Sequence, residues 1–299
     1  MLINSIFLTG STGFVGKNLI KYLDNRFEIH NFNRGSQILI KSPIVLHLAG
    51  KAHDIKDVSD ISEYYVVNTE LSIKLFDSFL FSDAKVFITL SSVKAAADSL
   101  ESTLTEDYSP NPITHYGKSK LLAEQYILSK SIPEGKRVYI LRPCMIHGPG
   151  NKGNLNLLYK IVSKGFPWPL GAFENQRSFC SIDNLCFIIN ELMNNEAIPS
   201  GVYNVADDDP VATNELIKLM ATSQDKKYHI WNLPKSIIKI ISQLGDFLGL
   251  PLNSERLNKL TETYIVSNNK IIKAMNKPLP LSAKEGLMKT LNSFNTNAK

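Results

Sequence analysis

A glycine-rich turn directly after the first apolar run constrains the fold of this chain more than any other stretch. The run covers residues 3–9, the turn reads GSTGFVG over 10–16, and apolar residues follow at helical spacing from Val15 to Leu23. Glycines permit a tight turn and let a pyrophosphate approach the backbone at a helix N-terminus, where free N–H groups favour anions. The spacing is GxxGxxG instead of GxGxxG, yet the order of strand, turn and helix predicts a dinucleotide site. The residues expected to contact the cofactor here are Gly10, Thr12, Gly13, Phe14, Val15 and Gly16.

The rest of the first half alternates between apolar runs and polar or amphipathic stretches. Further strands are expected at 27–32, 43–50, 85–90 and 137–142. The chain is long enough for one large α/β domain with a smaller lobe, so we predict a Rossmann-type doubly wound parallel sheet with an α+β substrate lobe. The connection over 35–42 is short, so a crossover helix there is trimmed or missing.

The alternation changes after residue 147, where the Gly/Pro/Asn-rich segment 148–154 begins. We therefore expect a nucleotide-binding domain over 1–147 and a mainly substrate-binding lobe over 148–299. Within the second range, a segment at about 178–206 is expected to return to the first domain.

Composition and charge favour small-molecule chemistry. Of 299 residues, 43% are hydrophobic, and the net charge of +5 is scattered without a basic run, so we expect no nucleic-acid partner. The cysteines, Cys144, Cys180 and Cys186, form no CxxC pair and are expected to be packing residues. His47, His53 and Asp54 lack further ligands at metal spacing, so no metal site is expected.

The sequence gives no sign of a membrane-spanning segment. The N-terminus is uncharged at its front, and no apolar run reaches the length that a bilayer requires, so a cytoplasmic location is expected. An apolar stripe runs from Leu233 to Leu250. An ordinary packed helix is the preferred interpretation of this stripe, ahead of a membrane-seeking one.

Three residues form a candidate catalytic set. Tyr116 and Lys120 lie four apart, so a helix would place them on one face, where the ammonium would lower the pKa of the phenol toward neutrality. Such a phenol is a tuned proton donor, although the same pair also occurs on many solvated helices. Ser92 follows the expected strand at 85–90, and ligands of open α/β sheets bind outside such strand ends.

The end of the strand at 27–32 bears on the choice of cofactor. A carboxylate there would bond the ribose 2′-hydroxyl of NAD, but Asn33 and Arg34 follow the strand instead. A guanidinium suits a 2′-phosphate, so NADP(H) is preferred and NAD(H) is possible; a solvated loop arginine is the alternative. Leu48 and Ala49 end the next strand among small residues, and Asn68 is a polar exception on an apolar helical stripe.

These features together resemble a known enzyme family over nearly the whole chain. The matching stretches are GSTGFVG, HLAG at 47–50, Asn68, LSS at 90–92, the YxxxK pair, RPCMIHGPG at 142–150 and QRSFCSIDN at 176–184. They are similar to extended short-chain dehydrogenase/reductases of the nucleotide-sugar epimerase/dehydratase family. The resemblance implies that Ser92, Tyr116 and Lys120 move a hydride and a proton at a sugar carbon, and that a homodimer forms through the Tyr116 helix.

The resemblance also implies contacts to both ligands. Cofactor contacts are expected at Leu48, Ala49, Asn68, Tyr116, Lys120 and Pro143, besides the glycine turn and residues 33–34. The second lobe is expected to hold a nucleotide-diphosphate sugar, and a surface ion pair is the alternative role for Arg177, whose fork geometry suits a diphosphate. The expected substrate contacts are Ser92, Val93, Lys94, Asn154, Leu170 and Arg177.

Three departures from the family pattern narrow the activity. In the 4,6-dehydratase branch two acidic residues follow the catalytic hydroxyl, whereas Val93 and Lys94 follow it here, so dehydration is not expected. The missing acidic residue after 27–32 argues against the tightly held NAD of 4-epimerases. The segments 91–94, 148–154 and 168–171 are most similar to bacterial reductases of 4-keto-6-deoxy nucleotide sugars, although alanines at 95–97 depart from that pattern.

We therefore expect an NADPH-dependent reductase of the C4 keto group of a nucleotide 4-keto-sugar, with UDP as the nucleotide, that makes precursors of bacterial surface polysaccharides. An NAD-dependent nucleotide-sugar 4-epimerase is the first alternative. A non-catalytic dinucleotide-binding protein and a reductase of non-nucleotide carbonyl compounds are further alternatives on the same fold.

Overall fold

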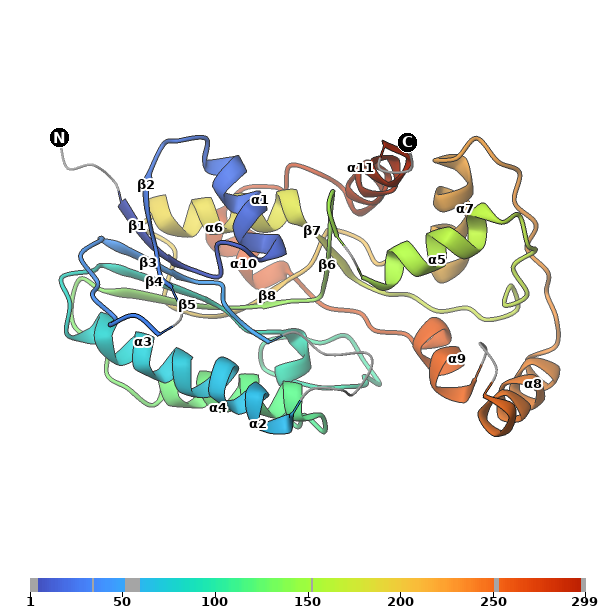
Figure 1. Ribbon diagram of the computed structural model, residues 1–299, viewed down its shortest axis with the longest axis horizontal. Helices are drawn as coiled ribbons and strands as arrows, with labels where there is room; N and C mark the ends of the chain where they lie inside the picture. The colour runs from blue at the N-terminus through green and yellow to red at the C-terminus, as the bar shows by residue number, and fades with distance from the viewer. Residues whose placement is uncertain (1–4, 34, 52–59, 152, 250–252, 297–299) are drawn as a thin grey trace.

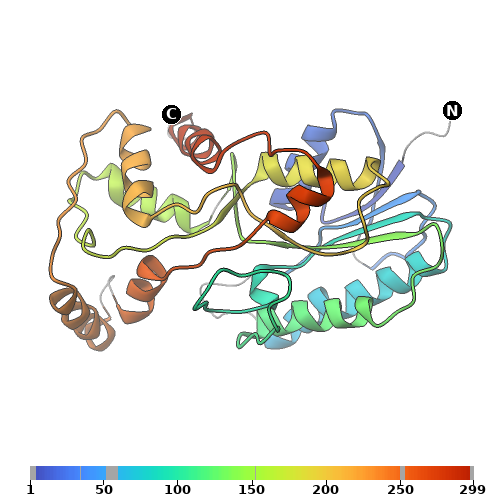
Figure 2. The same cartoon turned by 180° about the vertical axis from the view of Figure 1, so that it is seen from behind.

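The computed structural model describes residues 5–33, 35–51, 60–151, 153–249 and 253–296. Expectations for Arg34, His53 and Asp54 lie outside these ranges. Figures 1 and 2 show a sheet with helices on both faces at one end of the molecule and a smaller, mostly helical lobe at the other.

Six parallel strands form the main sheet, in the order β2-β1-β3-β4-β5-β8. The order reverses beside β1, because β2 lies on one side of it and β3 on the other. This topology confirms the predicted α/β doubly wound fold and brings the carboxyl ends of β1, β3 and β4 to one edge. The strands are β1 Ser5–Thr9, β2 Glu28–Asn31, β3 Ile44–His47, β4 Val86–Leu90, β5 Arg137–Pro143 and β8 Gly201–Val205.

Helices bury both faces of this sheet. One face packs against α1, α6 and α10 through Leu19, Ile188 and Ile271, and the other packs against α3 and α4 through Phe76 and Ile127. Residues between β2 and β3 that the structure describes contain no helix, as the short connection predicted. The bounds are α1 Phe14–Leu23, α2 Ile61–Tyr64, the π-helix η1 Tyr65–Glu70, α3 Leu71–Leu80, the 3₁₀ helix η2 Val93–Ala95, α4 His115–Leu128, α6 Ile182–Asn194 and α10 Asn269–Met275.

The second lobe has a hydrophobic core of its own, to which Leu155, Trp168, Leu216 and Leu287 belong. Between the lobes runs a parallel pair of short strands, β6 and β7. Although α6 and β8 come later in the chain than β6, their side chains join the core of the main sheet. The limits of the two domains remain a prediction. The elements are β6 Met145–His147, α5 Asn154–Ser163, β7 Phe179–Ser181, α7 Thr213–Thr222, α8 Lys235–Leu248, α9 Ser254–Thr261 and α11 Ala283–Thr296.

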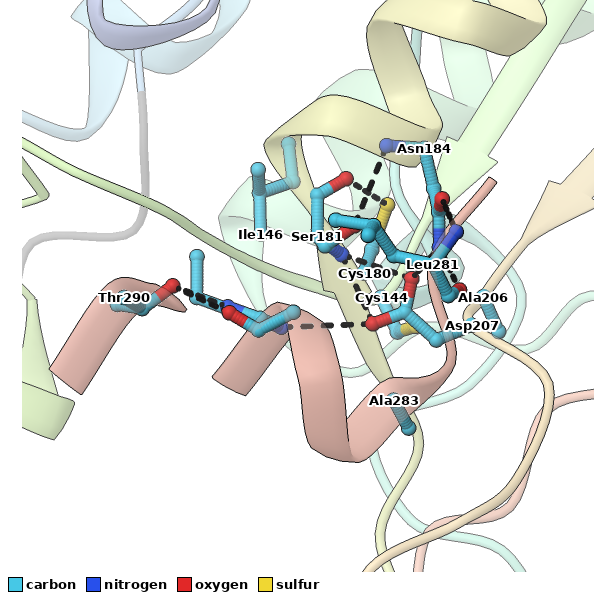
Figure 3. Close-up of polar contacts among 12 residues, drawn as sticks. Cys144, Ile146, Cys180, Ser181, Asn184, Ala206, Asp207, Leu281, Ala283 and Thr290 are labelled. Atoms are coloured by element: carbon cyan, nitrogen blue, oxygen red, sulfur yellow. Dashed lines mark hydrogen bonds and ion pairs between the residues drawn. The ribbon is translucent and has the colours of Figure 1, made fainter. Parts of the chain in front are cut away.

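A buried polar cluster around Asp207 joins these elements (Figure 3). The Asp207 carboxylate, which follows β8, accepts the Ser181 backbone N–H at 2.9 Å and the Asn184 side-chain amide at 2.7 Å. The His147 imidazole lies 3.4 Å from the same carboxylate and bonds the Thr290 hydroxyl of α11 at 2.8 Å. The cluster therefore fixes β6, β7 and α11 relative to one another, and with them the segments 142–150 and 176–184.

The helix predicted over Leu233–Leu250 forms and packs on the second core through Ile238, but most of its apolar stripe is not packed. The buried residues of α8 are Ile238, Ser242 and Gly245, whereas its six other large apolar side chains are exposed. An apolar stripe shows that a helix is amphipathic, but the neighbouring elements decide which of its faces is covered. In the part of the chain that the structure describes, no helix is long and apolar enough to cross a membrane.

Candidate active site

The glycine turn packs against the end of β3. Gly10 has a φ of +76°, and a Cβ there would lie 2.6 Å from the Ala49 nitrogen. A Cβ at Gly16 would collide with the Gly10 carbonyl oxygen. Gly13 precedes α1 and gives it no side-chain cap, so the first N–H groups of the helix are left for an anion.

The remaining cofactor contacts expected in the turn occupy different environments. Thr12 and Gly13 are exposed, whereas Phe14 and Val15 are partly buried. A Cβ at Gly148 would lie 3.3 Å from the Phe14 ring, so the Gly/Pro-rich segment after β6 passes directly over the start of α1.

Ser92 is the first of the expected catalytic residues and lies beyond the carboxyl end of β4. It follows β4 by two residues, is buried, and begins η2, where its hydroxyl accepts the Lys94 backbone N–H at 3.2 Å. The same hydroxyl is hydrogen-bonded to the Tyr116 phenol. The structure thus brings together two residues that are separated by 24 positions in sequence.

The start of α4 explains why Ser92 and Tyr116 meet. Thr114 caps the helix by accepting the Gly117 N–H at 3.2 Å, and Asp98 accepts the Thr114 hydroxyl at 3.0 Å. A Cβ at Gly117 would collide with the Lys94 carbonyl oxygen. Because position 117 carries no side chain, the first turn of α4 can lie directly on η2.

Lys120 lies one turn further along α4 and is buried. Its Nζ donates to the Leu90 carbonyl at 2.8 Å, and a Cβ at Gly50 would lie 2.9 Å from that nitrogen. Burial lowers the pKa of the Lys120 ammonium to about 8, although the nearby Glu124 carboxylate acts in the opposite direction. Lys120 is therefore charged in most molecules at neutral pH.

The expected lowering of the tyrosine pKa by Lys120 is not found in the structure. Burial raises the pKa of the Tyr116 phenol above its ordinary value, while the Ser92 hydrogen bond acts in the opposite direction. The Lys120 ammonium instead donates its hydrogen bond to the Leu90 carbonyl. Tyr116 is consequently a neutral phenol at neutral pH, which is the form that gives a proton away.

A chain of buried hydrogen bonds links the end of β3 to Asn68, and each of its groups has a defined role as donor or acceptor. The Ala49 N–H donates to the Thr9 hydroxyl at 3.2 Å, and Thr9 and His47 Nδ1 are 2.7 Å apart. His47 Nε2 lies 2.8 Å from the Ser72 hydroxyl, which donates to the Asn68 carbonyl at 2.7 Å. This order requires neutral His47 with its proton on Nε2, in agreement with a pKa that burial and Lys120 lower to about 3.

Asn68 links this chain of hydrogen bonds to α4, which carries Tyr116 and Lys120. Its side-chain amide donates to the Ser119 hydroxyl at 3.0 Å, and Ser119 donates to the Tyr116 carbonyl at 2.8 Å. Asn68 lies in the π-helix η1, a widened turn of the kind that often occurs at functional sites. Ser119, Gly50 and Glu124 were missed as site residues, because only their three-dimensional contacts distinguish them from ordinary helix and strand-end residues.

The expected substrate contacts do not all share one environment. Lys94 donates to the Asp98 carbonyl at 2.6 Å and lies 4.4 Å from the centre of the Tyr264 ring. The Arg177 guanidinium donates to the Lys259 carbonyl. Burial lowers the pKa of both cations, and the Glu262 carboxylate opposes this shift at each. The two cations therefore lie near one carboxylate, where the lobes meet.

The other expected contacts are placed as follows. Pro143 is buried at the end of β5, Val93 is buried at the start of η2, and Leu170 is buried in the second core. Asn154 begins α5. The assignment of all these residues to ligands remains a prediction.

Comparison with known proteins identifies the family. The sequence profile of the NAD dependent epimerase/dehydratase family matches residues 6–206. This chain belongs to that family. The match confirms the predicted relation to extended short-chain dehydrogenase/reductases and makes the protein an NAD(P)-dependent enzyme.

Relatives of this family member include epimerases and reductases. It is 31% identical to UDP-glucose 4-epimerase of Vibrio cholerae, over 97% of this chain and 95% of that protein. It is 27% identical to GDP-6-deoxy-D-mannose reductase of Pseudomonas aeruginosa, over 72% of this chain and 79% of that protein. The structure of RMD from Pseudomonas aeruginosa complexed with NADPH matches with a TM-score of 0.72 at 21% identity, covering 98% of this chain and 99% of that one, which shows a shared fold.

Proposed function

We propose that this protein reduces the C4 keto group of a nucleotide 4-keto-sugar with NADPH, and that the nucleotide is UDP. The observation that carries the proposal is the contact between Ser92 and a Tyr116 phenol whose pKa burial raises. A reduction needs a proton donor that is still protonated when the substrate binds, and Tyr116 meets that condition.

Each residue of the set has a defined task in this reaction. The nicotinamide supplies a hydride when it is bound. Ser92 donates a hydrogen bond to the C4 oxygen as negative charge develops there, a contribution of about 3 kcal/mol for donors of this type. Tyr116 then protonates the alkoxide, and the Lys120 ammonium stabilises the phenolate that remains.

The choice of NADPH is supported by the end of β2. Asn33 is exposed there, and no carboxylate stands at this position to hold a ribose 2′-hydroxyl or to repel a 2′-phosphate. An Asn33→Asp variant should bind NADPH at least tenfold more weakly and NADH no more weakly. Asn25→Asp introduces the same charge before β2 and serves as the matched control. Equal NADPH affinity in all three proteins would contradict the choice.

Arg177 is the proposed contact to the substrate diphosphate. Arg177 is partly buried and near enough to Lys94 to affect its pKa, with the Glu262 carboxylate close to both, and a guanidinium binds phosphate oxygens in a bidentate manner. An Arg177→Met variant should raise KM for the nucleotide sugar more than tenfold and leave NADPH affinity unchanged. An unchanged KM would favour a non-nucleotide carbonyl substrate.

A nucleotide-sugar 4-epimerase is the second candidate, favoured by the similarity to UDP-glucose 4-epimerase of Vibrio cholerae over 97% of this chain. An epimerase retains NAD through purification and needs no added reductant. Mass spectrometry of the nucleotide released from purified protein, with turnover assays that omit NADPH, separates the two candidates. Bound NAD together with reductant-free turnover would overturn the proposed reductase.

Loss of chemistry on the same fold is the remaining alternative. A Tyr116→Phe variant keeps the ring and removes the proton donor. We expect it to fold, to bind NADPH normally and to lose at least about a hundredfold in turnover. Full turnover in the folded variant would contradict the role of Tyr116.

The homodimer through α4 is also part of the proposal. Light scattering measures the molar mass in solution and so tests whether the protein is a dimer.

A further inference from the structure

Helix α8 presents its apolar side to solvent. Phe247 is 88% exposed and Leu248 is 62% exposed, although both belong to the helix of the second lobe in which apolar and polar residues are most clearly separated onto opposite faces. The positions recur every three or four residues, so they form one continuous stripe along the helix. We name this stripe the α8 face. It comprises Ile237, Ile240, Ile241, Leu244, Phe247 and Leu248.

The opposite arrangement would be normal for a helix of a soluble protein. Here the covered side consists of Ile238, Ser242 and Gly245, two of which are small or polar. Ser242 donates to the Lys239 carbonyl within the helix, and Asp246 accepts the Ser254 N–H at the start of α9. The protein therefore holds α8 through Ile238, which joins the second core, and through small or polar residues, while six other large apolar side chains of the helix face outward.

The position of α8 leaves this face open. Figures 1 and 2 show α8 beside α9 at the end of the second lobe that is furthest from the main sheet. The stripe contains six large apolar side chains, each at least 41% exposed. Scattered apolar residues are normal on protein surfaces, whereas a contiguous stripe of this kind marks an interaction site.

The surroundings of the α8 face identify the kind of partner. From residue 226 to 245 the chain carries four lysines and no Asp or Glu, and Asp225 and Asp246 flank this stretch, so lysines outnumber acidic residues there by two. Tyr228 and Trp231, the aromatic residues of this stretch, are 45% and 55% exposed. Large aliphatic side chains, interfacial aromatics and an excess of lysine are the composition of helices that lie in the headgroup region of a membrane.

We propose that the α8 face docks on the surface of a bilayer that contains anionic lipid. The apolar stripe enters the boundary between headgroups and acyl chains, and the lysines of the 226–245 segment interact with lipid phosphates. The helix lies in the plane of the surface, because its 14 residues do not span a bilayer. Docking in this way requires no change in the fold, and it does not depend on the proposed reductase activity.

Sedimentation of the full-length protein with lipid vesicles tests the proposal. Vesicles of phosphatidylcholine alone are compared with vesicles that also contain phosphatidylglycerol. Wild-type protein should sediment with the anionic vesicles and less with the neutral ones. The double variant Ile240→Gln/Phe247→Gln should lower the partition coefficient by roughly tenfold or more, because two exposed apolar side chains no longer enter the membrane.

Phe81 offers a matched control. It is 93% exposed at the end of α3 in the other lobe, so Phe81→Gln removes an equally exposed ring far from α8. This variant should bind vesicles as wild type does, and circular dichroism should show that all proteins are folded. A Lys235→Gln/Lys239→Gln variant should lose the preference for anionic vesicles.

Three outcomes would overturn the proposal. One is wild-type protein that sediments with neither vesicle. Another is an α8-face variant that binds as tightly as wild type. The third is a concentration-dependent self-association that the Ile240→Gln/Phe247→Gln variant abolishes while vesicle binding is absent, since a second copy of the chain would then be the occupant of the face.

Discussion

Replacing Lys120 by Met tests the electrostatic description of the site most directly. Lys120 is 7% exposed, and burial lowers its pKa from 10.5 to about 8. A shift of this size means that folding disfavours the charged form by about 3 kcal/mol at neutral pH. The Met side chain keeps the apolar stem and carries no charge, so part of this penalty disappears. Loss of the bond from Nζ to the Leu90 carbonyl opposes the gain by about 1.5–3 kcal/mol.

The pH dependence isolates the effect of the charge. A lysine with a depressed folded pKa makes the unfolded state bind more protons between the two pKa values, so stability rises with pH in that window. Between about pH 7 and about pH 9.5, wild type should therefore gain about 2 kcal/mol relative to Lys120→Met. Buried cysteines and tyrosines with raised pKa values act in the opposite sense, but they are common to both proteins and cancel in the difference.

Urea unfolding of both proteins at several pH values measures this difference. Under the proposed mechanism the variant should also lack turnover, because the ammonium proposed to stabilise the Tyr116 phenolate is missing. A stability difference that stays constant from neutral to alkaline pH would refute the depressed pKa of Lys120. A difference that grows in favour of the variant as the pH rises would refute the sign of the shift.

Three further substitutions follow from single contacts. Glu124→Gln leaves the buried Arg142 guanidinium without its carboxylate, whose oxygens lie 3.0 and 3.1 Å from Nε, and should lower the free energy of unfolding by about 3–5 kcal/mol in urea titrations. Gly16→Ala drives a Cβ against the Gly10 carbonyl and should weaken NADPH binding more than tenfold in fluorescence titrations; normal affinity would contradict the tight turn. Asp207→Asn places an amide opposite N–H donors and should cost about 1–3 kcal/mol of stability, visible as a lower Tm.

Much of the fold was predictable because its signals are local. The glycine turn, the apolar runs and the helical stripe that begins at Val15 depend on neighbours within a few residues, and these elements form where they were expected. Tyr116 and Lys120 were found for the same reason, since a four-residue spacing is a property of one helix. Asn68 was singled out as a polar exception on an apolar helical stripe and again by the family resemblance, but its role in the hydrogen-bond chain comes only from three-dimensional contacts.

The local environment of each site residue was decided by packing between distant segments. Gly117 allows α4 to rest on η2, and this contact brings Tyr116 to Ser92. The direction of the Tyr116 pKa shift was predicted wrongly, because spacing reveals that a lysine is near but not how deeply both groups are buried. Desolvation depends on the surrounding fold.

The same division holds for α8. Its sequence determines that a helix with an apolar stripe forms near residues 235–248, and the structure contains that helix. Only the tertiary structure decides that Ile238, Ser242 and Gly245 face the protein while Phe247 faces outward. The physical reason is that periodicity is fixed by backbone geometry within one segment, whereas burial is fixed by the segments that pack against it.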